Sequence, residues 1–294
     1  MIFMTTTAWL LSLAVIFGTL VLLPFAIKSI VSSEDVKKFS NDYNERIREF
    51  APYVALMFSI PILNIVLRNV FEEFFYDAGI EITDLIYGWE GYLVSIIQQF
   101  ATPKVTSFMT FAYIFLYFFI IVLTTAVYLF DSEKIYLKQL IIAFAINYGI
   151  GLISYLVFIA YGPRVFIDSY VEGLMYQAYP FIWELTSLVN TPSNVFPSLH
   201  TSISVTVALF SLSTVKKYPK LPIIVVTSAI LVIISTMYLG IHWFIDVLVG
   251  TILGTLSYLI ATNYTKISLP NNFKLNWPFN RLTKVYRTQK SYSK

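Results

Sequence analysis

Seven stretches of mostly apolar residues are the feature that most limits how this chain can fold. They cover residues 8–30, 51–70, 106–130, 139–161, 199–214, 222–240 and 243–262. A helix needs about 20 mostly apolar residues to cross the hydrocarbon core of a bilayer. The sequence therefore predicts an all-α, polytopic membrane bundle, in which the short fifth helix begins below the membrane surface or tilts.

The composition excludes most other classes of protein. Hydrophobic residues make up 57% of the chain and charged residues only 13%, whereas soluble domains have about 25% charged residues. A soluble globular enzyme, a disordered chain, collagen and a coiled coil are all excluded by this ratio. The chain has no cysteine, which excludes disulfide scaffolds, thiolate metal sites and cysteine nucleophiles.

The basic residues predict how the helices are oriented in the membrane. No positive charge precedes the first stretch and Lys28 follows it, which differs from a secretory signal and places the N-terminus outside. With seven helices, the cytoplasmic segments and the C-terminal tail then hold all but three of the 20 basic residues. Lys and Arg collect on the cytoplasmic side, so we expect a multi-pass protein of the cell membrane with a cytoplasmic C-terminus.

Two segments predicted outside the membrane, 71–105 and 163–195, are longer than plain turns. In the first, apolar residues repeat at helical spacing until Pro103; they are Leu93, Ile96, Ile97 and Phe100. This pattern predicts an amphipathic helix that lies in the outer membrane interface. The nearby Glu90, Gln98 and Gln99 have two interpretations: they form the solvated face of this helix, or they line a pocket for an acceptor.

The two histidines of the chain, His200 and His242, each stand at the outer end of a predicted membrane helix. Asp246 follows His242 by four residues, which places both on one helix face. Ionisable residues at such depth are costly and usually face a polar cavity. Gly250 and Gly254 continue the same stripe and predict close packing of a neighbouring helix.

These residue types suit attack on a phosphorus centre. An imidazole is a nucleophile when a carboxylate accepts its other N–H, which gives His242 and Asp246 those two roles. His200 is then the candidate that gives and takes the proton of the leaving and attacking oxygens. Ser198, two residues earlier, is a candidate donor to a phosphate oxygen, although Ser at this position is also a common helix cap.

Arg164 is the sole basic residue of the second outer segment. One interpretation is that it binds the substrate phosphate. The other is that it anchors the chain at the membrane interface, with its long side chain reaching the headgroups.

The sequence resembles the type 2 phosphatidic acid phosphatase (PAP2) superfamily. Pro197-Ser198-Leu199-His200 looks like its second signature, and Ser235 with His242-Trp243-Phe244-Ile245-Asp246 looks like its third. The resemblance implies a phosphohistidine on His242, acid/base catalysis by His200 and orientation by Asp246. It covers residues 51–262, which implies a catalytic domain of six helices. Residues 1–50 then form an extra helix and a cytoplasmic loop, and residues 263–294 a basic cytoplasmic tail.

Three positions depart from the family pattern. Thr236 stands where the third signature has Arg. Val157 stands where the first signature has Lys, and Arg164 lacks the Pro that should follow it. This combination is similar to the branch of inositol phosphorylceramide synthase-like transferases. The resemblance therefore leaves open hydrolysis and transfer of a phosphorylated headgroup to a lipid alcohol.

The sequence thus predicts a membrane enzyme that cleaves a lipid phosphate ester at the outer face of the bilayer. We expect no metal or other cofactor and no nucleic-acid partner; the partners are the bilayer and the lipid substrate. Two alternatives use the same residues differently. His200, His242 and Asp246 could form a three-ligand zinc site, or the chain could be a non-catalytic transporter or structural protein.

Overall fold

The structure is a computed structural model that describes residues 6–52, 55, 59, 79–187 and 191–267. Within them, five helical segments are long and apolar enough to span a membrane, and a sixth apolar helix is shorter. The long segments are α1 (Thr6–Ile30), α5–η1–α6 (Pro103–Phe130), α7 (Ile135–Val157), α12 (Leu221–Tyr238) and α13 (Phe244–Ile267); the shorter one is α11 (Leu199–Ser213). The predicted all-α polytopic bundle is therefore confirmed. Most of the predicted helix 51–70 and of the tail lies outside the described residues.

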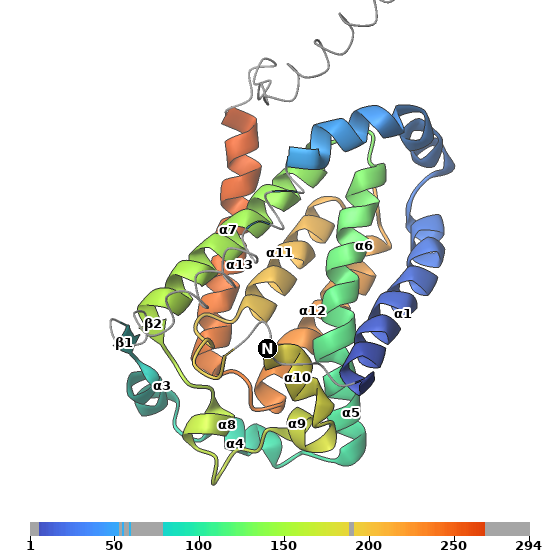
Figure 1. The fold of residues 1–294 in the computed structure, drawn as a ribbon. Coiled ribbons are helices and arrows are strands. Elements are labelled where there is room, and N and C mark those ends of the chain that lie inside the picture. The colour runs from blue at the N-terminus through green and yellow to red at the C-terminus, as the bar shows by residue number, and fades with distance from the viewer. Residues whose placement is uncertain (1–5, 53–54, 56–58, 60–78, 188–190, 268–294) are drawn as a thin grey trace, which may run out of the picture.

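Helix α11 forms the centre of the bundle. It packs against α6 (Tyr117–Phe130), α7, α12 and α13 (Figure 1). The contact with α13 is close because Gly250 and Gly254 face the carbonyl oxygens of Ser198 and Ser202, where a Cβ atom would collide. The predicted role of the two glycines is confirmed.

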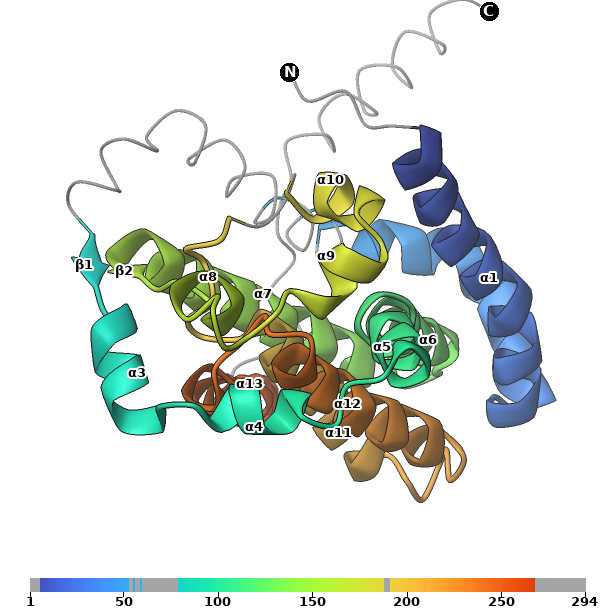
Figure 2. The same ribbon diagram turned by 90° about the horizontal axis from the view of Figure 1, so that it is seen from below.

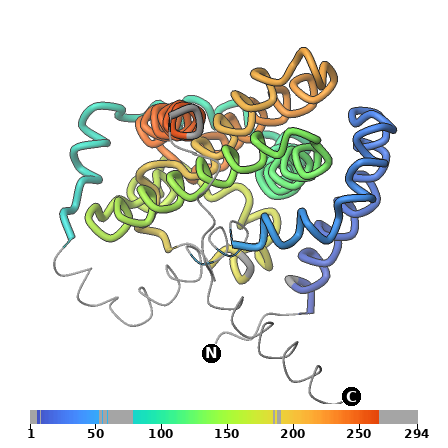
Figure 3. Tube along the Cα trace, turned by 90° about the horizontal axis from the view of Figure 1, so that it is seen from above, coloured from blue at the N-terminus to red at the C-terminus, as the bar shows by residue number. Residues whose placement is uncertain are grey.

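Helix α1 lies at the edge of the bundle, where it contacts α6 and the short helix α10 (Phe181–Ser187) (Figure 3). Many of its large apolar side chains are exposed, among them Trp9, Leu10, Leu13, Phe17 and Leu20. Helix α1 lies close to the ring of Phe115 at Gly18, which has no side chain in the way. Its outward face is therefore as apolar as a lipid-facing helix requires.

Short elements gather at the end of the bundle where α11 and α13 begin, which we call the histidine end (Figures 1 and 2). They are α3 (Thr83–Glu90), α4 (Leu93–Gln98), α8 (Pro163–Phe166), α9 (Leu174–Ala178) and α10. Helix α4 confirms that a helix forms here and ends before Pro103, while its place in the outer membrane interface stays a prediction.

Two strands of two residues also lie at the histidine end. Strand β1 (Ile80–Glu81) pairs in parallel with β2 (Phe158–Ile159), with Ile80 opposite Phe158. The predicted helix 139–161 is therefore wrong at its C-terminal boundary, because the chain becomes extended at Phe158 to make this pairing. This extended turn leads the chain into the second predicted outer segment.

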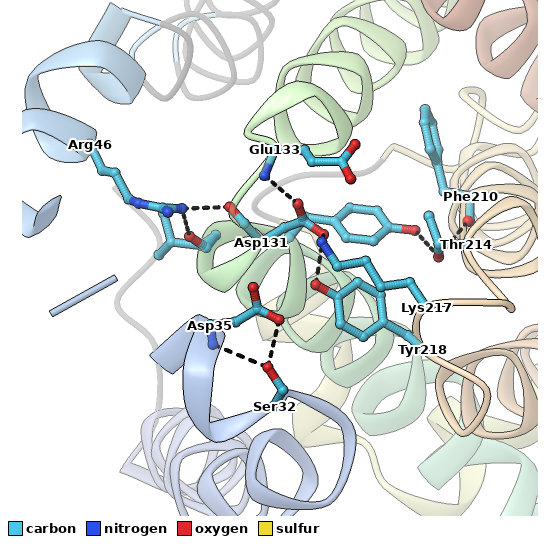
Figure 4. Close-up of polar contacts among 11 residues, drawn as sticks. Ser32, Asp35, Arg46, Asp131, Glu133, Phe210, Thr214, Lys217 and Tyr218 are labelled. Atoms are coloured by element: carbon cyan, nitrogen blue, oxygen red, sulfur yellow. Dashed lines mark hydrogen bonds and ion pairs between the residues drawn. The ribbon is translucent and has the colours of Figure 1, made fainter. Parts of the chain in front are cut away.

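The opposite end, where α6 and α11 finish, is held together by buried charges (Figure 4); we call it the aspartate end. Asp131 is fully buried, and its carboxylate accepts hydrogen bonds from Tyr218 (2.6 Å) and the amide of Glu133 (2.7 Å). Lys217 adds an ion pair at 2.9 Å. This carboxylate therefore joins the α6–α7 connection to the α11–α12 connection.

Arg46 ties residues 33–52, which are helical, to the same end (Figure 4). Its Nη1 atom donates to the carbonyl oxygens of Leu129 (3.0 Å) and Asp131 (2.6 Å), at the C-terminus of α6. Carbonyl oxygens at a helix C-terminus have no partner within the helix and attract a cation. Three segments that the sequence assigns to the cytoplasm, residues 31–50 and the α6–α7 and α11–α12 connections, thus come together at this one end.

Candidate active site

The first part of the candidate site is the pair His242 and Asp246. His242 lies in the connection between α12 and α13, and Asp246 lies in the first turn of α13. His242 Nδ1 is 3.3 Å from Asp246 Oδ2, which also accepts the Trp243 amide at 2.9 Å. Both side chains are buried, at 4% and 0% exposure. The predicted pairing is therefore present, with the carboxylate held in place by the main chain.

The second histidine comes to the same place from α11. His200 is the second residue of that helix, and its ring centroid is 6.5 Å from that of His242. Reacting atoms in an enzyme complex are about 3–3.5 Å apart, so a small group between the rings would be in reach of both. The convergence that the sequence predicted is observed.

Two tyrosines that the sequence reasoning missed enclose His200. Tyr113 stacks on it at 4.2 Å between centroids, and Tyr117 lies at 4.3 Å. Both come from the segment where η1 (Ala112–Leu116), a π-helix, interrupts the span Pro103–Phe130. A π-helix shifts the side chains that follow it around the axis and is frequent at functional sites. Nothing in the sequence marked this interruption within an apolar stretch.

Arg164 is placed beside the histidines. It lies in α8, and its amide donates to the carbonyl oxygen of Gly240 in the loop that leads to His242. Its guanidinium covers the ring of Tyr176 at 4.9 Å, and its charge acts on His242. The Nη1 atom is buried and has no hydrogen-bond partner among the residues that the structure describes. Such an atom is a donor ready for an anion.

Ser198 takes the helix-cap position. Its hydroxyl accepts the amide of Thr201 at 3.3 Å, and its side chain is fully buried. Its own amide donates to the main-chain oxygen of Asp246 at 3.1 Å, and Tyr155 donates to the carbonyl oxygen of Pro197 at 2.9 Å. Ser198 therefore joins the two signature segments directly, and its predicted contact with phosphate stays a prediction.

A solvated face does not describe Glu90 and Gln98, whereas Gln99 is exposed, and a pocket for an acceptor stays a prediction. Glu90 accepts the amide of Ile245 at 3.0 Å, and its Oε1 atom is buried. Burial raises the pKa of this carboxyl above its ordinary value. Gln98 donates to the carbonyl oxygens of Glu172 (2.8 Å) and Tyr238 (3.0 Å). Both side chains turn inward because the main chain of the site supplies partners there.

The zinc alternative lacks its ligand geometry. In the part of the chain that the structure describes, no group of three or more His, Asp or Glu side chains lies close enough to hold a metal ion. His200 lies against the rings of Tyr113 and Tyr117, and its ring centroid is 6.5 Å from that of His242.

A sequence model described as the PAP2 superfamily matches residues 83–260. This chain belongs to that superfamily. Its members are generally phosphoesterases or phosphotransferases, and the match extends over both histidines and Asp246. No curated protein and no solved structure matches the chain significantly.

Proposed function

We propose that this membrane protein cleaves a lipid phosphate ester through a phosphohistidine intermediate. One observation carries the proposal: two imidazoles from separate helices lie 6.5 Å apart, and a buried carboxylate backs one of them. A purely structural role would not require both of the chain's histidines at one place. The partners are then a lipid phosphate and the bilayer.

The proposed reaction has two steps. In the first, His242 Nε2 forms a bond to phosphorus while the P–O bond to the leaving group breaks, and His200 gives its proton to that leaving oxygen. Asp246 accepts the Nδ1–H and stabilises the charge on the phosphorylated ring. In the second, water or an alcohol gives its proton to His200 and attacks the phosphorus, which releases His242.

Arg164 is the proposed phosphate-binding residue. Two observations support this role: its Nη1 atom has no hydrogen-bond partner among the described residues, and its amide binds Gly240 in the loop that leads to His242. A guanidinium binds phosphate oxygens with charge-assisted hydrogen bonds, which are stronger than those between neutral groups. Ser198, at the N-terminus of α11, stands beside the amides that would contribute to the same anion site.

Headgroup transfer is the second candidate, and the position of Thr236 favours it. Thr236 is fully buried, and its hydroxyl donates to the carbonyl oxygen of Ile233. No cation therefore replaces the Arg of the family signature at this position. A phosphodiester carries one negative charge fewer than a phosphomonoester dianion, so a site with fewer cations suits a phospholipid donor and a lipid-alcohol acceptor, as in the inositol phosphorylceramide synthase-like branch.

One experiment tests both candidates. Purified protein in vesicles would be incubated with phosphatidic acid, a long-chain isoprenoid pyrophosphate or an inositol phospholipid, each with and without ceramide. Hydrolysis predicts release of phosphate from phosphatidic acid or the pyrophosphate, and of inositol phosphate from the inositol phospholipid, with or without ceramide. Transfer predicts a new phosphorylated lipid only when ceramide is present. A labelled covalent intermediate that His242→Ala abolishes supports the proposal. Full activity of His242→Ala and His200→Ala would instead identify a non-catalytic protein.

The proposal includes the orientation: N-terminus outside, C-terminus cytoplasmic and the histidine end outside the cytoplasm. It is supported by the gathering of the basic segments at the aspartate end. Because the chain has no cysteine, single substitutions give a clean test with a membrane-impermeant thiol reagent on intact cells. Ser169→Cys, at an exposed position of the histidine end, should be labelled, and Lys216→Cys, exposed at the other end, should not. The reverse pattern would contradict the orientation.

A further inference from the structure

Glu90 makes a contact that the proposed chemistry does not use. It is the last residue of α3, and its carboxylate accepts the amide of Ile245, 155 positions later in the chain. The carboxylate also interacts with the amide of Phe244. These two amides belong to the first turn of α13, the turn that contains Asp246. Glu90 thus reaches the catalytic helix from a different part of the fold.

The first turn of α13 cannot be capped by its own preceding residue. The first amides of a helix have no partner within it, and a Ser, Thr, Asp or Asn before the helix usually accepts one. Here the preceding residue is Trp243, whose indole has only a donor. That donor is engaged elsewhere, with the carbonyl oxygen of Tyr161 at 2.8 Å. An acceptor from outside α13 is therefore required.

Asp246 supplies the other half of the cap. In a capping box, the residue three positions into the helix accepts the amide of the residue before it. Asp246 does this for Trp243 with Oδ2, the same oxygen that faces His242 Nδ1. The direction of the Asp246 carboxylate, and with it the partner of His242, depends on this turn keeping its shape.

We infer that Glu90 is a positioning residue: by capping α13 from α3, it holds the Asp246 carboxylate against the imidazole of His242. A negative carboxylate at a helix N-terminus is also favourable for the helix dipole. Glu90 touches neither histidine and therefore acts through the turn. The inference rests on the proposed function only for its effect on the reaction rate.

The placement of α3 gives this contact a second consequence. Helices α3 and α4 expose large apolar side chains, with Trp89 next to Glu90 exposed at 79%. Gln98, at the end of α4, bridges the main chains of Glu172 and Tyr238. An amphipathic segment with this pattern lies in a membrane interface. Glu90 therefore connects a membrane-surface segment to the turn that orients His242.

Histidine NMR tests the inference without using activity. The chain has two histidines, so ¹⁵N-histidine labelling of the protein in nanodiscs gives two imidazole signals, which His200→Gln assigns. Glu90→Ala should shift the His242 signals toward a mixture of tautomers and leave those of His200 in place. Glu90→Gln keeps an acceptor oxygen and should restore the His242 signals. Asp84→Asn, which neutralises an exposed carboxylate on the same helix, is the matched control and should change neither.

Kinetics supply the second measurement. Misplacement of a reacting group by 1 Å costs about 100-fold in rate, so Glu90→Ala should lower kcat by about 10- to 100-fold with KM unchanged. Glu90→Gln should recover most of kcat. Unchanged His242 signals in Glu90→Ala would overturn the inference, and so would a change in KM alone. If the wild-type protein shows no His242-dependent activity, the proposed function fails, while the NMR comparison still decides whether Glu90 orients His242.

Discussion

Asp131 and Asp246 are both completely buried carboxylates, at opposite ends of the same bundle, and their surroundings differ. Both oxygens of Asp131 have partners, including the tyrosine Tyr218 and the cation Lys217. Asp246 has no cation partner among the described residues, and its Oδ1 atom has no hydrogen bond. Buried polar groups are normally satisfied, and one left unsatisfied is costly. The comparison separates an end whose buried carboxylate is fully paired, as a stabilising contact requires, from an end whose buried carboxylate keeps one oxygen unpaired among the described residues.

The same contrast holds for two arginines, Arg46 at the aspartate end and Arg164 at the histidine end. At the aspartate end, Arg46 gives both hydrogens of Nη1 to main-chain oxygens, although its Nε atom has no partner. At the histidine end, Arg164 lies over the ring of Tyr176, and its Nη1 atom has no acceptor in the part of the chain that the structure describes. An anion would satisfy Arg164, whereas Arg46 already neutralises the end of a helix.

We expect the largest effect on kcat for Asp246→Asn, which tests the contrast between Asp246 and Asp131. Replacing the orienting carboxylate of a histidine nucleophile favours the wrong tautomer, and loss of about 10⁴-fold in kcat is typical of such a change. The thermal unfolding temperature in detergent should change little. Asp168→Asn, an exposed neighbour at the same end, should keep wild-type kcat. Retained activity in Asp246→Asn would remove the distinction between the two aspartates.

Arg164→Ala should have the next largest effect. Loss of one preorganised donor to a charged oxygen lowers activity by about 10²- to 10³-fold, which we expect in kcat/KM for the lipid phosphate. Lys104→Ala removes an exposed cation from the same end and should lower kcat/KM much less. Equal losses in the two variants would show that Arg164 contributes only general positive charge.

Asp131→Ala should affect stability and leave chemistry unchanged. Breaking a buried ion pair by removing one partner costs roughly 3 kcal/mol in the free energy of unfolding, and here Tyr218 also loses its acceptor. Unfolding in a mixed-micelle denaturant titration measures the change, with Glu133→Ala as the exposed control. A fall in kcat of the folded variant beyond about 2-fold would contradict the assignment of this end to stability.

The smallest effect is expected for the pH dependence of stability, through the ionisation of Glu90. Burial raises the pKa of the Glu90 carboxyl, and the negative charge of Asp246 raises it further. The folded protein therefore binds this proton more tightly than the unfolded chain does. Its contribution to stability is therefore greatest below the ordinary value of about 4.3 and falls as pH rises through the folded-state pKa. Relative to wild type, Glu90→Gln should gain stability between acidic and neutral pH, measured by thermal unfolding. If the difference in unfolding temperature between Glu90→Gln and wild type did not change with pH, Glu90 would ionise as an exposed residue does.

Short-range patterns account for the part of the site that could be predicted. The His242–Asp246 pair is an i, i+4 spacing at a helix start, and Gly250 and Gly254 extend the same stripe. The central position of α11 was not predictable, but His200 could be assigned because the chain has only one other histidine. Spacing within one helix fixes which side chains share a face.

Long-range contacts account for what was missed. Tyr218 meets Asp131 across 87 residues, and Glu90 meets Ile245 across 155. The faces of Tyr113 and Tyr117 depend on a π-helix that hydrophobicity does not reveal. The partner of Glu90 was not predictable either, because its sequence neighbours Trp89 and Tyr92 are typical of a membrane interface while its partner amide comes from another helix.

The sequence by itself determined that this chain is a membrane bundle and which imidazole has a carboxylate beside it. Apolar length and helical periodicity are local properties, and a bilayer leaves a chain of this composition few alternatives. Only the tertiary structure decided which polar groups are satisfied. Around the start of α13, packing left Arg164 Nη1 and Asp246 Oδ1 without hydrogen-bond partners among the described residues. At the other end of the bundle, packing gave both oxygens of Asp131 partners.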